Sequence, residues 1–420
     1  MTLAPKAFLT SIFEAAVAAA DPERTIRDHL PERSKGRTIV IGAGKGAAQM
    51  AAAFEKVWDG PIEGLVVTRY GYGAPTKRIE VIEAAHPVPD KAGLEAGQRL
   101  LRQVEGLGED DLVVALVCGG GSALLPAPAG SLTLEDEIAV NEALLASGAP
   151  ISVMNAIRKH VSAIKGGRLA AAAHPARVVS LIVSDIPGDN PALVASGPTV
   201  PDAASRADAL KAIEAYGIEL PERVIAHLNS PEADAPRPDD KRFARNEVKL
   251  IASAAVSLEA AAAEAKRLGI EAVILSDSIE GEAREVGSVH AAIAREIATR
   301  NRPFQKPVLL LSGGETTVTL RAKGKGGRNT EFLLSFALGI DGFYGIHALA
   351  ADTDGIDGSE DNAGAFCDGE TVRRMRAAGV DAGALLAANN AWTAFDAVDD
   401  LFVPGPTGTN VNDLRAILVR

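Results

Sequence analysis

The sequence predicts an α/β protein with two α/β domains: a Rossmann-like parallel sheet with helices on both faces, then a smaller domain with a mixed sheet. Three observations predict this class. The chain of 420 residues is too long for one ordinary hydrophobic core. Its composition, 47% apolar with 41 glycines and only 4% aromatic residues, is typical of Ala-, Val- and Leu-rich α/β layers. Strand and helix patterns also alternate along most of the chain.

The first domain is expected over residues 1–235. Short apolar runs alternate there with segments of helical periodicity, and this alternation predicts βαβ units and therefore a parallel sheet. A loop rich in tyrosine, glycine and proline follows the second expected strand. The expected strands lie at 38–41, 65–68, 112–118 and 178–184, and the expected helices at 45–57, 91–106, 133–147 and 152–164.

The second domain is expected over residues 245–420, where the alternation resumes. The segment 228–246 is rich in proline and charge and lacks periodicity, so it is the expected linker or exposed connection. Within the second domain, "VTLRAKGKGGRN" indicates a strand followed by a basic glycine loop. The other expected strands lie at 248–253, 272–276 and 308–312, and the expected helices at 255–268 and 282–299.

Bulk properties favour a cytoplasmic enzyme that acts on a small molecule. The net charge of −12 is unfavourable for binding nucleic acid. Two isolated cysteines fit a reducing compartment. No window reaches 18 uncharged apolar residues, so no membrane span is expected. The first 23 residues resemble a signal peptide, but Glu14 interrupts the apolar run and the pattern predicts an amphipathic helix. The sequence indicates no particular oligomeric state.

The segment "GAGKGA" (42–47) follows an expected strand and opens an expected helix, as an anion-binding turn does. Gly42, Gly44 and Ala47 satisfy the dinucleotide fingerprint, and Gly46 extends the turn. An NAD site would need an acidic residue about 20 residues further on. Arg69 stands near that position and would suit a 2′-phosphate, so an NADP reductase is one alternative. Tight packing of strand against helix is another.

Lys45 favours a phosphoryl ligand over these alternatives, because a lysine within such a turn supplies positive charge. A P-loop is absent: Gly44-Lys45 and Gly324-Lys325 are each followed by glycine. The absence of this motif argues against a Walker-type NTPase. The Lys45 turn is one of several candidate anion sites along the chain.

"CGGGSALLPAP" (118–128) supplies a second glycine turn after an apolar strand. Gly119, Gly120 and Gly121 allow close backbone approach to a ligand, and Ser122 adds a hydroxyl. A simple turn is the alternative. The nucleophile pattern G-x-S-x-G fails at Leu124, which excludes a serine hydrolase of that type.

Cations and acids follow in the next two segments. The helix expected at 152–164 has a polar face opposite an apolar stripe, which is either solvated or, through Arg158 and Lys165, a site for an anionic substrate. Asp185 and Asp189 in "SDIPGDN" follow an expected strand and would therefore lie at the carboxyl edge of the sheet, where open α/β sheets bind ligands. A carboxylate there can orient or deprotonate an alcohol, bind Mg²⁺, or merely cap a turn.

The segment 312–332 combines a third glycine turn with hydroxyl groups, an acid and flexible cations. This composition predicts a phosphate clamp that closes over a nucleotide, with a basic hairpin tip as the alternative. In the acidic stretch 350–368, Asp354 and Asp357 are candidate Mg²⁺ ligands or turn residues. The candidate binding residues of the clamp are Ser312, Gly313, Gly314, Glu315, Thr316, Lys325, Arg328 and Asn329.

Several anion-binding turns, separate cations and loose carboxylates without a Walker motif describe a phosphotransferase for a small anionic alcohol. The sequence also resembles the glycerate 2-kinase family, the class II glycerate kinases, over nearly its whole length. The C-terminal part, about 305–415, resembles the MOFRL domain. The resemblance rests on these motifs, in order: "IGAGKGA", "CGGGSALLPAP", "RKHVSAIKGGRLA", "SDIPGDNPALVASGPTVPD", "LLSGGETTVTLRAKGKGGRNTE", "ADTDGIDGSEDNAGA" and "GPTGTNVNDL".

The resemblance implies a site in the cleft between two domains. It implies transfer of the ATP γ-phosphoryl group to the 2-hydroxyl of D-glycerate, with Mg²⁺, giving 2-phosphoglycerate. Lys45 and Arg328 match the family's charged active-site residues, and Asp189 matches the acid near the chemistry; Asp189 and Asp354 are the expected metal ligands. Members of the family are also labelled hydroxypyruvate reductases, so an NAD(P)H-dependent reductase is the runner-up. A non-enzymatic sensor of sugar acids or nucleotides is a further alternative.

Overall fold

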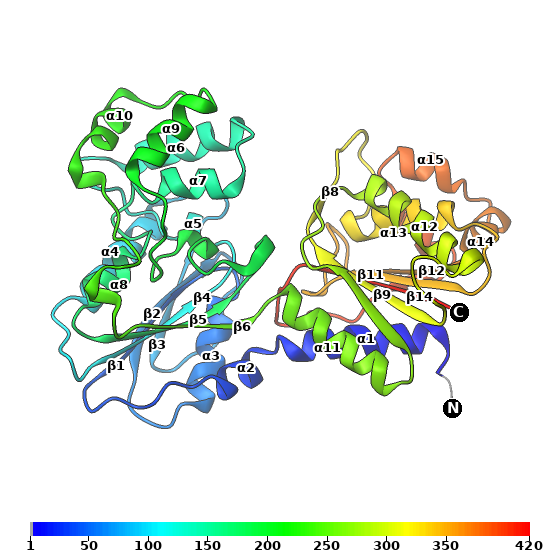
Figure 1. Ribbon diagram of the computed structural model, residues 1–420, viewed down its shortest axis with the longest axis horizontal. Helices are drawn as coiled ribbons and strands as arrows, with labels where there is room; N and C mark the ends of the chain where they lie inside the picture. Colours follow the sequence, from blue (N-terminus) through cyan, green and yellow to red (C-terminus); the bar gives the residue numbers. More distant parts are fainter. Residues whose placement is uncertain (1–2) are drawn as a thin grey trace. The chain divides into compact units, whose positions relative to one another are not determined.

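The computed structural model describes residues 3–420, with only the backbone of Pro187, and consists of two compact units (Figure 1). We call residues 22–251 the parallel-sheet unit and residues 3–21 with 252–420 the mixed-sheet unit. Both are α/β, which confirms the predicted fold class. Among residues 3–420, no helix combines the length and apolarity needed to cross a membrane.

The parallel-sheet unit contains six strands in the order β3-β2-β1-β4-β5-β6. Strands β1 to β5 run parallel to one another. Every residue of β1 and of β4 is buried, as expected for continuous apolar runs in a sheet covered on both faces. The strands are β1 (Thr38–Ala43), β2 (Glu63–Arg69), β3 (Ile79–Ala84), β4 (Leu112–Val117), β5 (Arg177–Val183) and β6 (Glu247–Ala252).

Helices cover both faces of this sheet, as predicted. Helices α4 (Lys91–Val104) and α8 (Arg168–Ala173) pack on one face and share its largest apolar core. Helix α3 (Ala47–Val57) packs on β1, β2 and β4, with α2 (Pro22–Asp28) beside it (Figure 1). A one-turn helix, α5 (Gly121–Leu124), follows β4. The sheet is therefore the middle layer of three.

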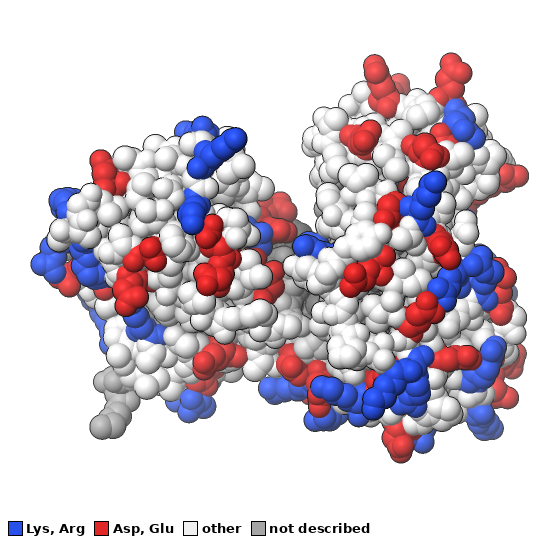
Figure 2. All heavy atoms as spheres, turned by 180° about the vertical axis from the view of Figure 1, so that it is seen from behind, with Lys and Arg blue, Asp and Glu red and all other residues white. Residues whose placement is uncertain are grey.

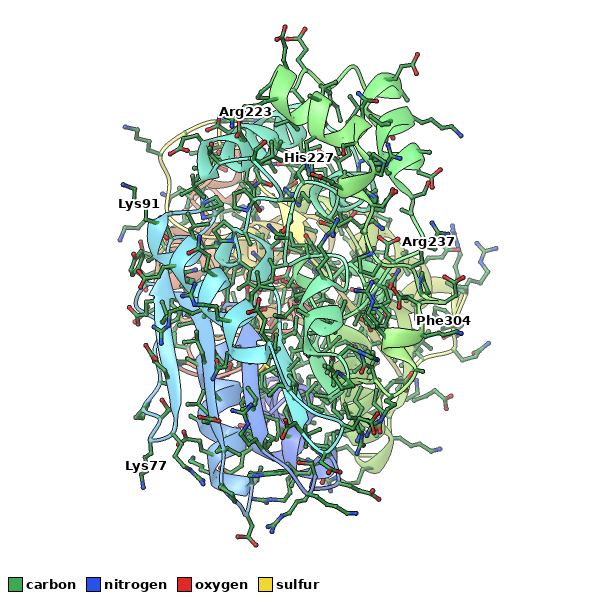
Figure 3. The ribbon with its side chains drawn as sticks, turned by 90° about the vertical axis from the view of Figure 1, so that its left-hand side faces the viewer. Lys77, Lys91, Arg223, His227, Arg237 and Phe304 are labelled. Carbon is green, nitrogen blue, oxygen red and sulfur yellow. The ribbon has the colours of Figure 1, made fainter. Side chains whose placement is uncertain are left out.

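Four further helices form a second apolar core in the parallel-sheet unit, built on residues such as Val140, Ile157 and Ile213. Figure 1 shows these helices grouped together at one end of the sheet, and Arg223 and His227 mark α10 in Figure 3. The helix expected at 152–164 ends at Arg158, because the chain turns there to form the next loop. The four are α6 (Leu134–Ala146), α7 (Ile151–Arg158), α9 (Arg206–Ala215) and α10 (Glu222–Asn229).

The mixed-sheet unit contains six strands in the order β13-β12-β11-β14-β9-β7. The pair β7–β9 is parallel, and the other pairs are antiparallel. A separate parallel pair joins β8 (Gly281–Glu282) to β10 (Thr316–Thr317). The six strands are β7 (Glu271–Ser276), β9 (Val308–Gly314), β11 (Ile346–Asp352), β12 (Gly364–Asp368), β13 (Leu401–Phe402) and β14 (Asp413–Val419).

Helices cover both faces of the mixed sheet as well. On one face, α1 (Pro5–Ala19) and α11 (Ala254–Arg267) bury Phe8, Ile12 and Phe13 against the strands. On the other face, the longer α12 and α13 build a core around Phe332 and Phe336. That face carries α12 (Ala283–Arg300), α13 (Arg328–Gly339), α14 (Thr371–Ala377), α15 (Ala382–Ala387) and α16 (Ala391–Asp396).

The unit boundaries differ from the predicted ones. The first domain was expected over 1–235, but α1 packs in the mixed-sheet unit, and residues 1 and 2 lie outside the described part. The expected connection 228–246 lies within the parallel-sheet unit, because β6 after it completes that sheet. A proline-rich, charged composition indicates an exposed loop, but it does not show whether the loop joins two cores.

Charged side chains are spread over the surface. Figure 2 shows acidic and basic side chains interspersed on the face that it draws. The chain carries 55 acidic and 43 basic residues, a net charge of −12. An anion must therefore be bound by local cations and amides, and the positions of individual lysines and arginines identify candidate sites.

Candidate active site

The loops after β1 and β4 meet at the carboxyl edge of the parallel sheet, as predicted. The amide of Lys45 donates to the carbonyl of Gly119 at 2.8 Å, and the amide of Cys118 donates to Ala43 at 3.1 Å. Asp185, just after β5, reaches the same place: a Cβ on Gly119 would overlap its carboxylate. The edge where open α/β sheets bind ligands thus carries a lysine, an acid and two glycine loops.

Two glycines are required by this close approach. Gly44 has φ of 141°, and a Cβ there would overlap the Cys118 sulfur. Gly120 has φ of 78°, and a Cβ there would lie 2.9 Å from Cγ of Lys45 and 3.1 Å from Nε2 of His86. The left-handed conformation and the lack of space both favour glycine. Backbone therefore lies directly beside Lys45 and His86.

Of the two glycine loops at this edge, only the one after β4 has amides without an acceptor among the described residues. In the first loop, the amide of Gly44 donates to Val67 at 3.1 Å, and that of Gly46 to the Cys118 sulfur at 3.2 Å. The expected anion-binding turn of Gly42, Gly44 and Gly46 is therefore closed by internal hydrogen bonds. The amides of residues 119–121 donate to no other described residue. Successive free amides of this kind bind anions.

Lys45 is half-buried beside these amides and, within the described part of the chain, forms no ion pair. Lys159 and Lys165, by contrast, are paired with Asp202 and Glu137. A half-buried ammonium without a carboxylate partner attracts an anionic ligand. Lys45 is thus the sequence-predicted residue whose geometry fits an anion site best.

His86 was not predicted, and it lies against the same loop. His86 follows the edge strand β3 (Ile79–Ala84) in the chain. Lys77, just before this strand, and Lys91, at the start of α4, are labelled in Figure 3. Burial, with Lys45 and Arg69 nearby, lowers the pKa of His86 to about 4, so the ring is neutral near pH 7. The sequence signal was "HPVPD", which stayed unassigned because strand β3 was not predicted.

The thiol of Cys118 is a structural part of this edge. Burial raises its pKa to about 12, and its sulfur accepts from the Gly46 amide at 3.2 Å. A protonated, buried thiol is a poor nucleophile. Cys118 and Cys367 are both free and buried.

Ser122 and Arg158 belong to one polar network. The Ser122 hydroxyl lies 2.8 Å from the Ser196 hydroxyl, which donates to Oδ1 of Asn155 at 2.9 Å. Arg158 donates to the same Oδ1 at 3.4 Å, and burial lowers its pKa. Ser196 has φ of 59° and Ala195 has φ of 52°, an uncommon left-handed conformation for residues other than glycine. The structure thus connects these two predicted residues through Ser196 and Asn155.

Lys165 has a structural role in the parallel-sheet unit. Its ammonium is fully buried and paired with Glu137. The glycines after it are used in packing: the amide of Gly166 donates to Ser196 at 3.0 Å and that of Gly167 to Gly197 at 2.7 Å. The interpretation of this segment as a solvated helical face was wrong, since the polar residues Asn155, Lys159, Ser162 and Lys165 are all buried.

The two candidate acids after β5 occupy different positions. Asp185 lies against Gly119, as described above. Asp189 ends a short 3-10 turn, Pro187–Asp189, with φ of 51°, and is half-buried. The acid that the structure brings to the glycine loop is therefore Asp185.

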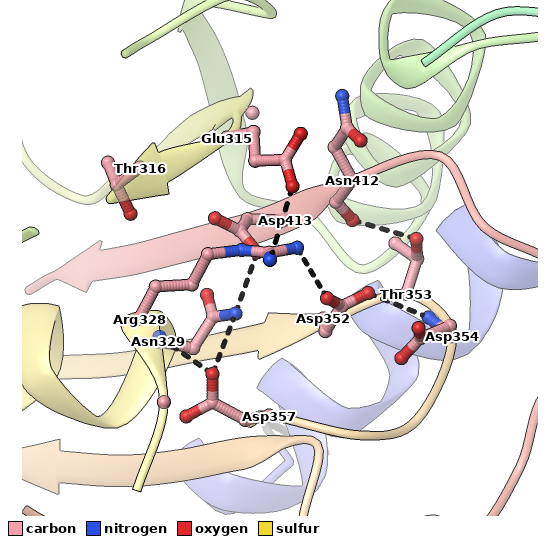
Figure 4. Close-up of polar contacts among 12 residues, drawn as sticks. Glu315, Thr316, Arg328, Asn329, Asp352, Thr353, Asp354, Asp357, Asn412 and Asp413 are labelled. Carbon is pink, nitrogen blue, oxygen red and sulfur yellow. Dashed lines mark hydrogen bonds and ion pairs between the residues drawn. The ribbon is translucent and has the colours of Figure 1, made fainter. Parts of the chain in front are cut away.

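In the mixed-sheet unit, Arg328 at the start of α13 is surrounded by three carboxylates (Figure 4). Its Nε lies 2.8 Å from Asp413, an NH2 nitrogen lies 2.6 Å from Asp352, and an NH1 nitrogen lies 3.3 Å from Glu315. Burial opposes the charge, but these acids raise the pKa of Arg328 above its usual value. Burial likewise raises the pKa of Asp352. Arg328 is paired, unlike the free clamp expected from the sequence.

The glycine loop before Arg328 leads into a capped helix. Asp357 accepts from the amides of Asn329 at 2.9 Å and Thr330 at 2.8 Å. The Asn329 side chain donates to Asp413 at 2.7 Å, and Arg415 also binds Asp413 at 2.7 Å. Asn329 and Asp357 therefore act in the structure by holding the start of α13.

Other predicted residues of this segment also have partners. Ser312 is buried, and its hydroxyl lies 3.1 Å from Nε2 of His290. The Thr316 hydroxyl and the Gly313 carbonyl accept from Arg415, each at 3.2 Å. Gly314, with φ of 111°, packs against the backbone of Ile279. Lys325 is exposed; it is paired with Glu360 at 3.4 Å and lies over the Trp392 ring. Exposure leaves Lys325 and Glu315 able to change partners.

The expected metal ligands do not come together as a set. Asp189 lies in the parallel-sheet unit and Asp354 in the mixed-sheet unit. The Asp354 carboxylate accepts from the Ile356 amide at 2.8 Å. Across residues 3–420, no group of three or more His, Cys, Asp or Glu side chains is arranged to hold a metal ion. The described residues therefore do not form a preassembled metal site with three or more protein ligands.

Comparisons with known proteins agree over nearly the whole chain. Two family models match: a domain of unknown function, DUF4147, over residues 8–229, and the MOFRL family over 308–413. A putative hydroxypyruvate reductase from Agrobacterium vitis is 53% identical over 98% of this chain and 94% of its own length. A glycerate 2-kinase from Pyrococcus horikoshii is 41% identical over 96% of this chain and 95% of its own length. A crystal structure of glycerate kinase from Thermotoga maritima matches at 39% identity and a TM-score of 0.90, covering 99% of both chains.

Proposed function

Because the chain belongs to the glycerate 2-kinase family, we propose that it transfers the γ-phosphoryl group of ATP to the 2-hydroxyl of D-glycerate, giving 2-phosphoglycerate. The observation that carries the proposal is the unpaired, half-buried ammonium of Lys45 beside the free amides of residues 119–121. Phosphoryl transfer needs positioned positive charge and hydrogen-bond donors more than covalent chemistry. This group of donors supplies both.

We assign the residues of this edge as follows. Lys45 and the amides of 119–121 bind negative charge, and ATP, when bound, supplies the phosphoryl group. Asp189 orients the 2-hydroxyl, as the family motif implies. Asp185 competes for that role, because its carboxylate lies against Gly119. No step is assigned to a metal, since the described residues do not assemble a site for one.

Arg328 is proposed to bind the substrate carboxylate or a phosphate after exchanging one partner. Its contact with Glu315 is the longest of its three ion pairs, 3.3 Å against 2.6 and 2.8 Å, and the Glu315 side chain is 55% exposed. An exposed ion pair contributes little to stability, so an anion can displace Glu315 at low cost. Asp352 and Asp413 then keep the guanidinium in position.

A hydroxypyruvate reductase is the second candidate, supported by the name of the relative that is 53% identical. A dinucleotide needs free amides at the first glycine loop. Those of Gly44 and Gly46 are used internally, and the Arg69 guanidinium stacks on the Tyr72 ring at 3.9 Å. These contacts support the kinase over the reductase.

The deciding experiment incubates the pure protein with D-glycerate, ATP and Mg²⁺ and passes the product to enolase without phosphoglycerate mutase. Phosphoenolpyruvate is expected, since enolase acts on 2-phosphoglycerate. ADP release without phosphoenolpyruvate would contradict the 2-hydroxyl as acceptor. No ADP release, together with NADPH oxidation by hydroxypyruvate, would replace the kinase by the reductase.

The same assay tests the site. Lys45→Met is expected to lower kcat/KM at least about a hundredfold, because it removes charge from a preorganised site. Lys77→Met, which removes an exposed lysine of the same unit, is the matched control and should match the wild type. Comparing Asp185→Asn with Asp189→Asn identifies the acid, since only the residue at the hydroxyl lowers kcat without changing KM for ATP. Near-normal turnover of Lys45→Met would refute its assignment.

A further inference from the structure

We propose that His86 is a substrate-binding residue whose Nε2 hydrogen-bonds the hydroxyl of D-glycerate that is not phosphorylated. The inference rests on the proposed function and adds a determinant of substrate choice to it. His86 lies between the first two glycine-rich motifs of the chain, "IGAGKGA" and "CGGGSALLPAP", and belongs to neither. Its position beside Lys45 and Gly120 is what assigns it to the site.

His86 and Lys45 border one small space beside Gly120. Nε2 of His86 and the Lys45 side chain face the same point: a Cβ on Gly120 would lie 3.1 Å from Nε2 and 2.9 to 3.1 Å from Cγ and Cε of Lys45. The loop leaves that point free of a side chain. Backbone amides of 119–121 border it. A small ligand held there by Lys45 comes within reach of the imidazole.

The imidazole of His86 has no hydrogen-bond partner among the described residues. The ring of His86 is half-buried, and no described residue forms a hydrogen bond with either ring nitrogen. His290, by contrast, uses both ring nitrogens, with Val286 and Ser312. Half-buried polar atoms without protein partners bind a ligand or water. His86 therefore has a ring nitrogen available to a ligand.

The charge state of His86 favours a hydroxyl as its partner. Burial and the nearby cations Lys45 and Arg69 keep the ring neutral. The negative groups of the substrate are bound by Lys45, whereas a neutral ring complements a neutral hydroxyl. Such a weak base is also unsuited to removing the proton of the reacting hydroxyl, because a general base works best with a pKa near the operating pH. Nε2 of His86 is therefore expected to bind the hydroxyl of D-glycerate that does not react.

The test compares two substrates that differ only at that hydroxyl. D-lactate keeps the carboxylate and the 2-hydroxyl of D-glycerate but has no 3-hydroxyl. The wild type is expected to favour D-glycerate at least about tenfold in kcat/KM, measured as ADP release. In His86→Phe, kcat/KM for D-glycerate falls, D-lactate is hardly affected, and the ratio drops to within about twofold. His86→Ala answers the same question if the phenylalanine variant does not fold.

His174→Phe is the matched control, since His174 is exposed, lies in the same unit and is also followed by proline. It is expected to keep the wild-type ratio. An equal loss for both substrates in His86→Phe would overturn the proposal, because it would indicate contact with a shared group or a structural role. An unchanged ratio would overturn it too, while leaving the kinase assignment intact. If the wild type phosphorylates neither substrate, the proposed function and this inference fall together.

Discussion

His290 is a buried residue whose hydrogen bonds define its protonation state. Its Nδ1 lies 2.8 Å from the Val286 carbonyl and must donate, so Nε2 accepts from the Ser312 hydroxyl at 3.1 Å. Burial, with Arg415 nearby, lowers the pKa of His290 to about 4. Protonation would make Nε2 a donor to the Ser312 oxygen, reversing this hydrogen bond, and would place a charge in the core of the mixed-sheet unit.

This predicts acid sensitivity of the mixed-sheet unit. The pKa of His290 is lower in the folded chain than the ordinary 6.5, so its contribution to stability is complete above pH 6.5 and is lost as pH falls toward 4. The loss is about 3 kcal/mol over this interval. The free energy of unfolding, measured in urea between pH 7 and pH 4, is expected to decline less for His290→Gln than for the wild type. The exposed His174→Gln should decline as the wild type does, and equal slopes for all three proteins would contradict the assignment.

At this scale the sequence predicted residue types but not their partners. Lys45 was singled out for its place in a glycine turn, and the geometry supports that choice. Lys165 and Ser312 have equally suggestive neighbours in sequence, but they contact Glu137 and His290, which are 28 and 22 residues away. Whether a cation is available to a ligand depends on which acids reach it in the fold and on how exposed they are. Local sequence patterns do not contain that information.

The start of helix α13 depends on a residue far away in the chain. Oδ1 of Asp357 accepts from the Asn329 amide, and Oδ2 accepts from the Thr330 amide and hydroxyl, all at 2.8 to 2.9 Å. These amides have no partner within the helix. A carboxylate at a helix N-terminus is also favoured by the helix dipole. Asp357 thus caps the helix that carries Arg328.

We therefore expect Asp357→Ala to destabilise the mixed-sheet unit by about 2 to 4 kcal/mol, because two buried amides lose their acceptor. Asp357→Asn keeps one carbonyl oxygen and is expected to cost less. Asp361→Ala is the control, since Asp361 is exposed in the same loop. Urea midpoints measure the difference. A midpoint for Asp357→Ala equal to that of Asp361→Ala would show that the cap contributes nothing.

At the scale of elements, strong periodicity was predicted well and distant capping was not. The expected helices at 255–268 and 282–299 agree closely with α11 and α12. The segment after Lys325 was interpreted as a flexible clamp, whereas it starts α13. Its N-cap position is Gly327, which has no side chain to signal a helix start. The cap comes from Asp357 instead, so the sequence around Arg328 lacks the usual signal.

At the scale of the whole molecule, the chain passes from one unit to the other twice, near residues 21 and 251. The sequence predicted two α/β domains but placed a single boundary between them. Helix α1 was correctly interpreted as amphipathic. An amphipathic pattern shows that a helix has an apolar face, but not which core covers that face. The mixed-sheet unit is therefore discontinuous in sequence, and its first helix precedes the whole parallel-sheet unit in the chain.

This organisation predicts that the mixed-sheet unit cannot fold stably without α1. Phe8, Leu9, Ile12 and Phe13 are at most 2% exposed and pack against α11 and the sheet. Burying four such side chains contributes roughly 6 to 12 kcal/mol, comparable to the whole stability of a domain. A chain that starts at residue 22 is therefore expected to keep the parallel-sheet unit and lose cooperative unfolding of the other.

The two tryptophans measure this separately, since Trp58 lies in the parallel-sheet unit and Trp392 in the mixed-sheet unit. In the shortened chain, a Trp392→Phe variant should show a native unfolding transition of Trp58. A Trp58→Phe variant should show Trp392 already unfolded without denaturant, and a peptide of residues 3–21 added in trans should restore its transition. A native Trp392 transition without α1 would mean that α11 and the strands suffice to stabilise that core.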